Sequence, residues 1–289
     1  MKIIRAAALG MCFGVRDALQ IANGVSDPSQ VTIHGELVHN RKVNERLSKA
    51  GFLQTPEDKR HETIQTSRVL ITAHGISQVE RQRLADAGKE VIDTTCPLVL
   101  NVHKAALELQ AEGRHVLLIG KAGHVEVQGV VDDLDSFDVI ESVQQVKHYE
   151  SESLGIVCQT TMPSDTVTEV CTYIQLHNPL ANIRFIDTVC DPTKRRQRAM
   201  GELLQQVDAM VVVGGHNSNN TRRLVELCHD KQTPVVHVED ASELEGAWFD
   251  DVTVVGLTAG TSTLDETVDA VQHVLEKISA RQQQEGSVT

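Results

Sequence analysis

Three cysteines of this chain occupy matching places at the ends of similar apolar runs. They are Cys12, Cys96 and Cys190, and 84 and then 94 residues separate them, about the length of a small domain each time. The runs that end at Cys96 and Cys190 share the sequence Ile-Asp-Thr-x-Cys. Thiolates at the same place in three repeated units indicate one shared centre, and thiolates are ligands of metal ions and iron–sulfur clusters.

The wide spacing of these cysteines limits the kinds of metal centre that they can form. Zinc ribbons use closely spaced pairs of ligands, unlike the wide spacing here. The sequence also contains no P-loop, no GxGxxG loop and no HExxH helix. Three thiolates without a fourth would leave one iron of a cluster with an open coordination position, where it acts as a Lewis acid and an electron donor. A three-cysteine zinc hydrolase and a 3Fe–4S form remain alternatives.

Polar, glycine-containing segments follow other apolar runs and are suited to hold a polyanion. Imidazole, hydroxyl and amide groups supply directed donors, so a diphosphate can bind without an excess of lysines. Glu126 is the one carboxylate in these segments, which makes it the candidate proton source. The segments are residues 34–35, 38–40, 73–75, 123–126, 159–161, 217–220 and 258–262.

Other conspicuous side chains are interpreted as structural. Cys158, Cys171 and Cys228 are expected to be small core residues. The basic run from Lys194 to Arg198 is interpreted as a solvated helix face, with docking of an acidic electron carrier as the alternative.

The chain between these residues predicts an α/β fold with parallel sheets. Short apolar, β-branched runs alternate with segments of helical period, and the runs are apolar almost throughout, as in strands covered on both faces. The predicted strands lie in residues 31–35, 68–75, 90–96, 115–120, 138–142, 154–161, 182–190, 209–215, 234–240 and 251–260. The predicted helices are residues 15–23, 40–50, 77–87, 99–112, 164–177, 194–207, 221–229 and 264–280.

The order of these elements repeats three times, which predicts three similar small domains. The first comprises residues 13–96 and the second residues 97–190. The third comprises residues 191–289 together with residues 1–12, because the last third lacks a closing strand and the N-terminal run supplies one. A single ten-stranded sheet with accidental cysteine spacing is the alternative. Right-handed crossovers place the loops at the carboxyl edges of the sheets, where ligands bind in open α/β folds.

Composition limits the partners. The net charge of −13 argues against nucleic acid or an anionic membrane surface as a partner, since both need a basic footprint. The N-terminal segment is too short and interrupted for a signal peptide, and no run of 18 apolar residues predicts a membrane span. We therefore expect a cytoplasmic protein whose cysteines are reduced and available as ligands.

Together, the motifs resemble the LytB family of iron–sulfur enzymes, the 4-hydroxy-3-methylbut-2-enyl diphosphate reductases. The resemblance extends from Met1 to about Ala280 and depends on many motifs in one order. They are residues 10–15 (GMCFGV), 38–40 (VHN), 73–75 (AHG), 95–99 (TCPLV), 123–129 (GHVEVQG), 159–161 (QTT), 187–190 (DTVC), 217–224 (NSNNTRRL) and 258–262 (TAGTS).

The resemblance implies a pseudo-threefold trefoil of three domains around one central 4Fe–4S cluster held by Cys12, Cys96 and Cys190. It implies that the substrate hydroxyl binds the open iron and leaves as water after the addition of two electrons and protons. The products would be isopentenyl and dimethylallyl diphosphate of the non-mevalonate isoprenoid route, with a ferredoxin or flavodoxin as electron donor. Glu126 matches the family's proton donor. The residues that match substrate-binding positions are His39, His74, His124, Thr160, Ser218, Asn219, Asn220 and Ser262.

The sequence departs from the family pattern near the expected site. Asn219 stands where a second serine is frequent, Thr263-Leu264 where a proline is common, and Asp191-Pro192 follows the third cysteine. These departures leave two alternatives open: a family member with a shifted substrate, or a cluster-based redox or ligand sensor.

Overall fold

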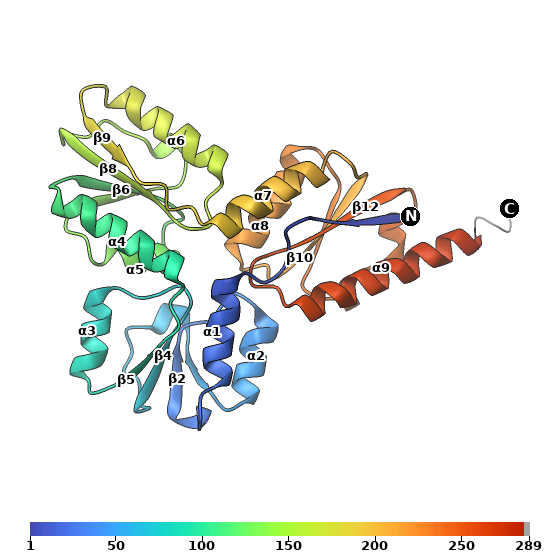
Figure 1. The fold of residues 1–289 in the computed structure, drawn as a ribbon, viewed down its shortest axis with the longest axis horizontal. Coiled ribbons are helices and arrows are strands. Elements are labelled where there is room, and N and C mark those ends of the chain that lie inside the picture. The colour runs from blue at the N-terminus through green and yellow to red at the C-terminus, as the bar shows by residue number, and fades with distance from the viewer. Residues whose placement is uncertain (286–289) are drawn as a thin grey trace. The chain divides into compact units, whose positions relative to one another are not determined.

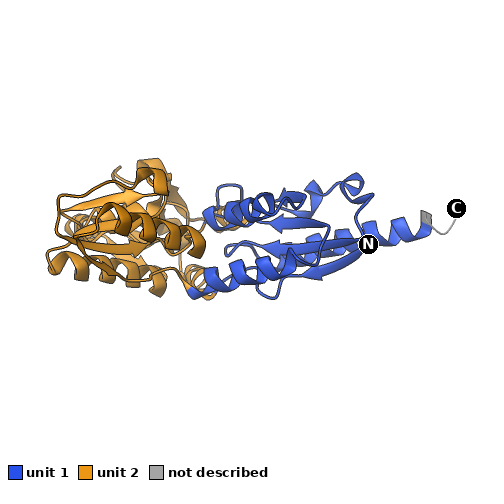
Figure 2. Ribbon diagram, turned by 90° about the horizontal axis from the view of Figure 1, so that it is seen from above, with its two compact units in different colours: residues 1–12, 39–41, 191–289 blue, residues 13–38, 42–190 orange. Residues whose placement is uncertain are grey.

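The computed structural model describes residues 1–285 and contains three parallel four-stranded sheets with helices packed on them (Figure 1). The chain divides into two compact units (Figure 2). Unit 1 comprises residues 1–12, 39–41 and the chain from residue 191 onward, and unit 2 comprises residues 13–38 and 42–190. Three separate parallel sheets confirm the predicted fold class and exclude a single ten-stranded sheet.

Unit 2 contains two of the sheets. The strand order of the first is β3-β2-β4-β5, and that of the second is β7-β6-β8-β9. The strands of the first are β2 (Val31–His34), β3 (Leu53–Thr55), β4 (Arg68–Ile71) and β5 (Glu90–Asp93), with helices α1 (Phe13–Asn23), α2 (Arg41–Lys49) and α3 (Gln78–Asp86). Those of the second are β6 (His115–Ile119), β7 (Phe137–Ile140), β8 (Ser153–Cys158) and β9 (Asn182–Phe185), with helices α4 (Pro97–Ala111), α5 (Val125–Val131) and α6 (Ser164–His177).

Unit 1 contains the third sheet, with strand order β1-β12-β10-β11. The elements are β1 (Lys2–Arg5), α7 (Asp191–Leu203), β10 (Ala209–Val213), α8 (Asn219–Asp230), β11 (Val235–Val238), β12 (Val254–Ala259) and α9 (Asp265–Glu285). The N-terminal strand β1 pairs in parallel with β12, as predicted, with Lys2 opposite Val254. The domain boundaries predicted from the sequence stay a prediction, and their last residues, 286–289, lie outside the described residues.

The second sheet shows how the apolar runs build a core on both faces. Side chains of a strand alternate between faces, so Val116 and Leu118 of β6 pack with helices α4 and α5. Leu117 and Ile119 point to the other face and pack with helix α6. All four side chains are fully buried, which explains why the run reads as continuously apolar.

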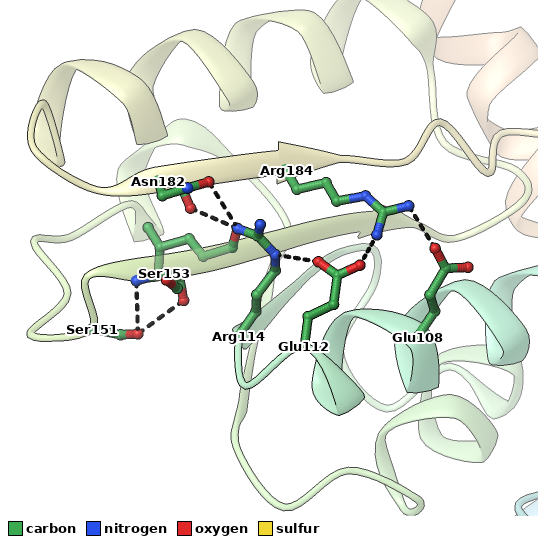
Figure 3. Close-up of polar contacts among 8 residues, drawn as sticks. Glu108, Glu112, Arg114, Ser151, Ser153, Asn182 and Arg184 are labelled. Carbon is green, nitrogen blue, oxygen red and sulfur yellow. Dashed lines mark hydrogen bonds and ion pairs between the residues drawn. The ribbon is translucent and has the colours of Figure 1, made fainter.

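A polar network joins the end of helix α4 to strands β8 and β9 of this sheet (Figure 3). Arg114 donates from Nη1 to the carbonyl oxygens of Leu154 and Asn182, at 3.2 and 2.8 Å, and from Nε to Glu112 at 2.7 Å. Arg184 of β9 forms ion pairs with Glu108, which lies in helix α4, and with Glu112, which follows that helix directly. These contacts hold the edge strand β9 against helix α4 and strand β8. They thereby support the chain that leads from β9 to Cys190.

Three local expectations were wrong. Strand β3 was not predicted, because its three residues are largely exposed and carry no apolar pattern. Helix α5 was absent from the list of predicted helices, because a glycine and several valines give it a low helical propensity. The cysteine-bearing runs are also shorter strands than expected, since β1, β5 and β9 end at Arg5, Asp93 and Phe185.

Within residues 1–285, no helix combines the length and the apolar character needed to cross a bilayer.

Candidate functional site

The three cysteines make the same backbone contact in their three sheets. The N–H of Cys12 donates to the carbonyl of Thr261 at 3.0 Å, that of Cys96 to Ala73 at 3.1 Å, and that of Cys190 to Thr160 at 3.0 Å. Each acceptor lies two residues beyond the end of the neighbouring inner strand, β12, β4 or β8. The cysteines are therefore equivalent by structure, within each sheet taken by itself.

Each of these cysteines also lies directly before a helix. Helices α1, α4 and α7 begin at Phe13, Pro97 and Asp191. A helix N-terminus favours negative charge, so each position suits a thiolate. None of the six cysteines, all within the described residues, forms a disulfide. The donor set and its placement fit a cluster that needs anionic sulfur ligands.

The shared Ile-Asp-Thr-x-Cys motif has a structural explanation. Asp93 accepts the N–H of Thr95 at 2.9 Å, and Asp187 accepts that of Val189 at 3.1 Å, so the same side-chain turn leads from each strand to its cysteine. The next residue is equivalent too. The hydroxyl of Thr94 donates to Ile71 O at 2.6 Å and that of Thr188 to Cys158 O at 2.5 Å.

The position of the Cys96 side chain leaves room only for a glycine at residue 14. A Cβ atom at Gly14 would lie against the sulfur of Cys96, inside any normal contact distance, and 3.2 Å from its Cβ. The second glycine in the sequence GMCFGV is thus explained by close approach to the cysteine that ends the same repeat.

Glu126 is held by the loop after β8. Its Oε1 accepts the N–H of Thr160 at 2.6 Å and its Oε2 accepts the Thr160 hydroxyl at 2.9 Å. Both side chains are buried, with Glu126 only 2% exposed. Because Cys190 donates to the carbonyl of the same Thr160, the proton-source candidate and one cysteine are fixed by a single residue.

His74 and His124 lie close together in unit 2. Their ring centroids are 5.8 Å apart in an edge-on arrangement, and both side chains are partly exposed. Nδ1 of His124 accepts the N–H of Glu126 at 3.2 Å and caps helix α5, which fixes the proton on Nε2 in the neutral ring. His124 therefore presents a donor beside the buried carboxylate.

The remaining predicted residues lie in unit 1. The hydroxyl of Ser262 donates to the carbonyl of His39 at 3.0 Å, and Asn40 Nδ2 donates to the carbonyl of Ser262 at 2.8 Å. These bonds join the loop that follows β12 to residues 39–41. Cys12 belongs to the same unit through its bond to Thr261.

Ser218, Asn219 and Asn220 form the start of helix α8. Ser218 is the N-cap and its hydroxyl oxygen accepts the N–H of Thr221 at 3.4 Å. Asn220 is buried, and its Nδ2 has no hydrogen-bond partner among the described residues. A buried amide donor without an acceptor at a helix N-terminus is the expected environment of a bound anion.

Thr221 belongs to the sequence motif of residues 217–224 but is not among the predicted substrate-binding residues. It is fully buried, and a Cβ at Gly214 or Gly260 would collide with its hydroxyl oxygen. Gly214 also has a backbone φ of 147°, which residues other than glycine rarely adopt. The two glycines thus allow the loops after β10 and β12 to pack directly against Thr221. Glycines that directly follow two adjacent strands are the sequence signal for this close packing.

Arg196 corrects one expectation. It is buried, not part of a solvated helix face, and it donates to the carbonyl of Gly10 and, at 3.0 Å, to that of Pro192. It supports the segment that leads from β1 to Cys12. Arg195 and Arg198 are exposed, as expected.

Within the residues described, no three His, Cys, Asp or Glu side chains of the structure form a ready-made site for a single metal ion. Of the three predicted ligands, Cys96 and Cys190 belong to unit 2 and Cys12 belongs to unit 1.

The fold and these loops define a class: an α/β protein of three parallel sheets, with the predicted substrate-binding residues in the segments that follow the inner strands. The model of the family described as "LytB protein" matches residues 3–276. The chain therefore belongs to the LytB family.

Individual relatives agree with this assignment. The chain is 36% identical to 4-hydroxy-3-methylbut-2-enyl diphosphate reductase of Trichlorobacter lovleyi, over 96% of this chain and 99% of that protein. It is 35% identical to the enzyme of the same name from Aquifex aeolicus, over 96% and 97%.

Solved structures are also similar to this chain. One is described as (E)-4-hydroxy-3-methyl-but-2-enyl diphosphate reductase, the terminal enzyme of the non-mevalonate pathway, with 32% identity and a TM-score of 0.69 over 96% of this chain and all of that one. The reductase structure from Plasmodium falciparum has a TM-score of 0.87 over 95% of this chain and 87% of that chain, and at 24% identity it supports the fold.

Proposed function

We propose that this protein reduces 4-hydroxy-3-methylbut-2-enyl diphosphate to isopentenyl and dimethylallyl diphosphate. Family membership and the names of full-length relatives support this function. The observation that carries this proposal is the structural equivalence of Cys12, Cys96 and Cys190. The backbone N–H of each donates a hydrogen bond to the carbonyl two residues after the neighbouring inner strand, and each cysteine lies directly before a helix.

The three cysteines would hold a 4Fe–4S cluster as thiolates, one cluster per chain. When bound, the cluster supplies two electrons and a Lewis-acidic iron for the loss of the substrate hydroxyl. Electrons would come from a small carrier of the ferredoxin or flavodoxin type. The helix N-termini that follow the cysteines stabilise the negative charge of the thiolates.

The diphosphate would be held by donors and not by a cluster of lysines. Nε2–H of His124 and the amide of Asn220 are candidate donors, and the N-terminus of α8 adds its dipole. His39, His74, Ser218, Asn219 and Ser262 complete the proposed substrate-binding set.

Glu126 would deliver the proton. Two hydrogen bonds from Thr160 fix the orientation of its carboxyl group, and burial keeps bulk water away from it. A positioned general acid contributes about 10²- to 10⁴-fold to a rate, so the removal of this group alone should nearly stop turnover.

The test is anaerobic turnover of the substrate by cluster-loaded protein with a chemical reductant. Glu126→Gln should lower kcat by about 100-fold or more and leave diphosphate affinity within about tenfold. Glu169→Gln, on the exposed face of helix α6, removes the same charge outside the site and should keep full activity. Failure of cluster-loaded wild-type protein to form either product refutes the proposal, and one zinc without iron or sulfide would indicate a hydrolase instead.

A further inference from the structure

Glu239 is a carboxylate of unit 1 that belongs neither to the sequence motifs nor to the proposed substrate-binding set. It directly follows β11, at the carboxyl edge of the third sheet, where ligands bind in open parallel sheets. Its side chain is only 18% exposed, so most of its surface is covered by protein. A charged group that is covered in this way needs partners for its oxygen atoms.

The two carboxylate oxygens of Glu239 hold two different segments. Oε1 accepts the backbone N–H of His216 at 3.0 Å. Oε2 accepts Nε–H of Arg41 at 3.1 Å, and the two side chains form an ion pair. Glu239 therefore connects the loop that follows β10 to residues 39–41, and both segments belong to unit 1.

Both segments carry residues that are proposed to bind the diphosphate. One contains His39, and the other leads to Ser218, the N-cap of helix α8. The segments also lie against each other. A Cβ at Gly215 would be 3.1 Å from the carbonyl oxygen of His39 and 3.7 Å from Oε1 of Glu239. The carboxylate thus lies where the two segments meet.

Residues 39–41 depend on side-chain contacts for their position. They form no strand, and only the last of them lies in a helix, as the first residue of α2. The chain on either side of them belongs to unit 2. Within unit 1, the hydroxyl of Ser262 binds the carbonyl of His39, and Glu239 binds the side chain of residue 41. Loss of the Glu239 contact should therefore change the position of His39 relative to helix α8.

We propose that Glu239 is a positioning residue for the diphosphate group. This role rests on the proposed function, in which His39 and the N-terminus of α8 bind that group. The charge of Glu239 repels a diphosphate, so Glu239 acts by fixing the spacing of the donors and not by direct contact. The two effects have opposite signs. Removal of a repelling charge alone should tighten diphosphate binding, whereas loss of positioning should weaken it.

Glu239→Gln tests this role in the cluster-loaded protein. An amide has one acceptor oxygen, so the glutamine can accept from His216 or from Arg41 but not from both. We expect KM for the substrate to rise about three- to tenfold and kcat to stay within about twofold, because only binding is weakened. Anaerobic isothermal titration with inorganic pyrophosphate should show the same loss of affinity.

Arg41→Gln removes the other partner of the ion pair and leaves the carboxylate bound to His216. It should also weaken pyrophosphate binding. The double variant should weaken binding by less than the product of the two single effects, because both substitutions break the same contact. Asp269→Asn is the matched control, since it breaks an ion pair of 3.0 Å with Arg5 in the same unit, between α9 and β1. It should keep the wild-type KM and pyrophosphate affinity.

Three outcomes overturn the role of Glu239. They are unchanged or tighter pyrophosphate binding by Glu239→Gln, a fall in kcat at unchanged KM, and independent effects of the two substitutions in the double variant. Absence of pyrophosphate binding by the wild type overturns it as well. Wild-type protein that binds pyrophosphate but forms neither product refutes the proposed function instead, and the titrations still decide the role of Glu239.

Discussion

Replacing Gly14 with alanine tests whether Cys96 must hold one fixed position. The added methyl group would collide with the Cys96 sulfur, and it lies 3.2 Å from its Cβ. Non-bonded carbon atoms prefer a separation of about 3.5–4.0 Å, so the sulfur must move by roughly 1 Å. Reactive constellations tolerate displacements of only about 0.5 Å, so this shift exceeds what a cluster ligand can absorb.

The magnitude follows from two opposing effects. Overpacking of this kind costs about 1–3 kcal/mol, whereas alanine in place of glycine favours a helix by up to about 1 kcal/mol. In the cluster-free protein the Cys96 side chain can rotate away, so stability should change little. In the loaded protein the ligated sulfur cannot move, and the strain should weaken retention of the cluster roughly 5- to 150-fold.

The assay is iron and sulfide content per chain after anaerobic reconstitution, followed by the rate of iron release to a chelator. Gly201→Ala is the control, because its Cβ meets no atom within 4 Å in helix α7. It should raise thermal stability slightly and leave the cluster unchanged. Wild-type iron content and release rate in Gly14→Ala would refute the assigned position of Cys96.

Three further outcomes are expected. Thr160→Val removes the 2.9 Å hydrogen bond to Glu126, worth about 0.5–1.5 kcal/mol, and steady-state kinetics should show kcat about 2- to 10-fold lower; an unchanged kcat contradicts the positioning role. Burial alone would raise the pKa of Glu80, but hydrogen bonds and charge from Arg83 and His34 outweigh it and hold the pKa at about 2. The stability that Glu80 contributes is therefore complete above its unfolded pKa and is lost as pH falls towards 2, so Tm scans of Glu80→Gln should lack this part of the acid sensitivity. Burial raises the pKa of the Cys228 thiol to about 12, so iodoacetamide at neutral pH should leave Cys228 unmodified in the native protein, as mass spectrometry of the digest can check.

The sheets and the site loops were predictable because their signal is local. A run such as residues 116–119 is apolar at every position, which requires cover on both faces. Glycines, histidines and hydroxyl residues directly after such runs mark the carboxyl edge of a parallel sheet. Most predicted site residues lie in these loops or at the start of the helices that follow.

Other features depend on polar and packing contacts that the apolar pattern of the sequence does not record. The strand before Cys96 ends at Asp93 because the aspartate side chain turns the chain, and an apolar count does not detect that turn. Arg196 is buried because Gly10, far away in sequence, presents a carbonyl to it. Helix α5 forms despite poor propensity because Val127, Val130 and Val131 are buried and His124 caps it.

The pairing of β1 with β12 has a consequence for the order of synthesis. Among the described strands, β1 leaves the ribosome first, and its partner β12, residues 254–259, leaves last. At a translation rate of about 5–20 residues per second, the first strand waits on the order of 10–50 s for an edge to join. Both sheets of unit 2 can be complete by then, with Cys96 and Cys190 already bonded to their own loops. Cys12 is therefore the last of the three thiols to reach its position in its own sheet, so insertion of a cluster would have to wait for the synthesis of β12 and the loop that follows it.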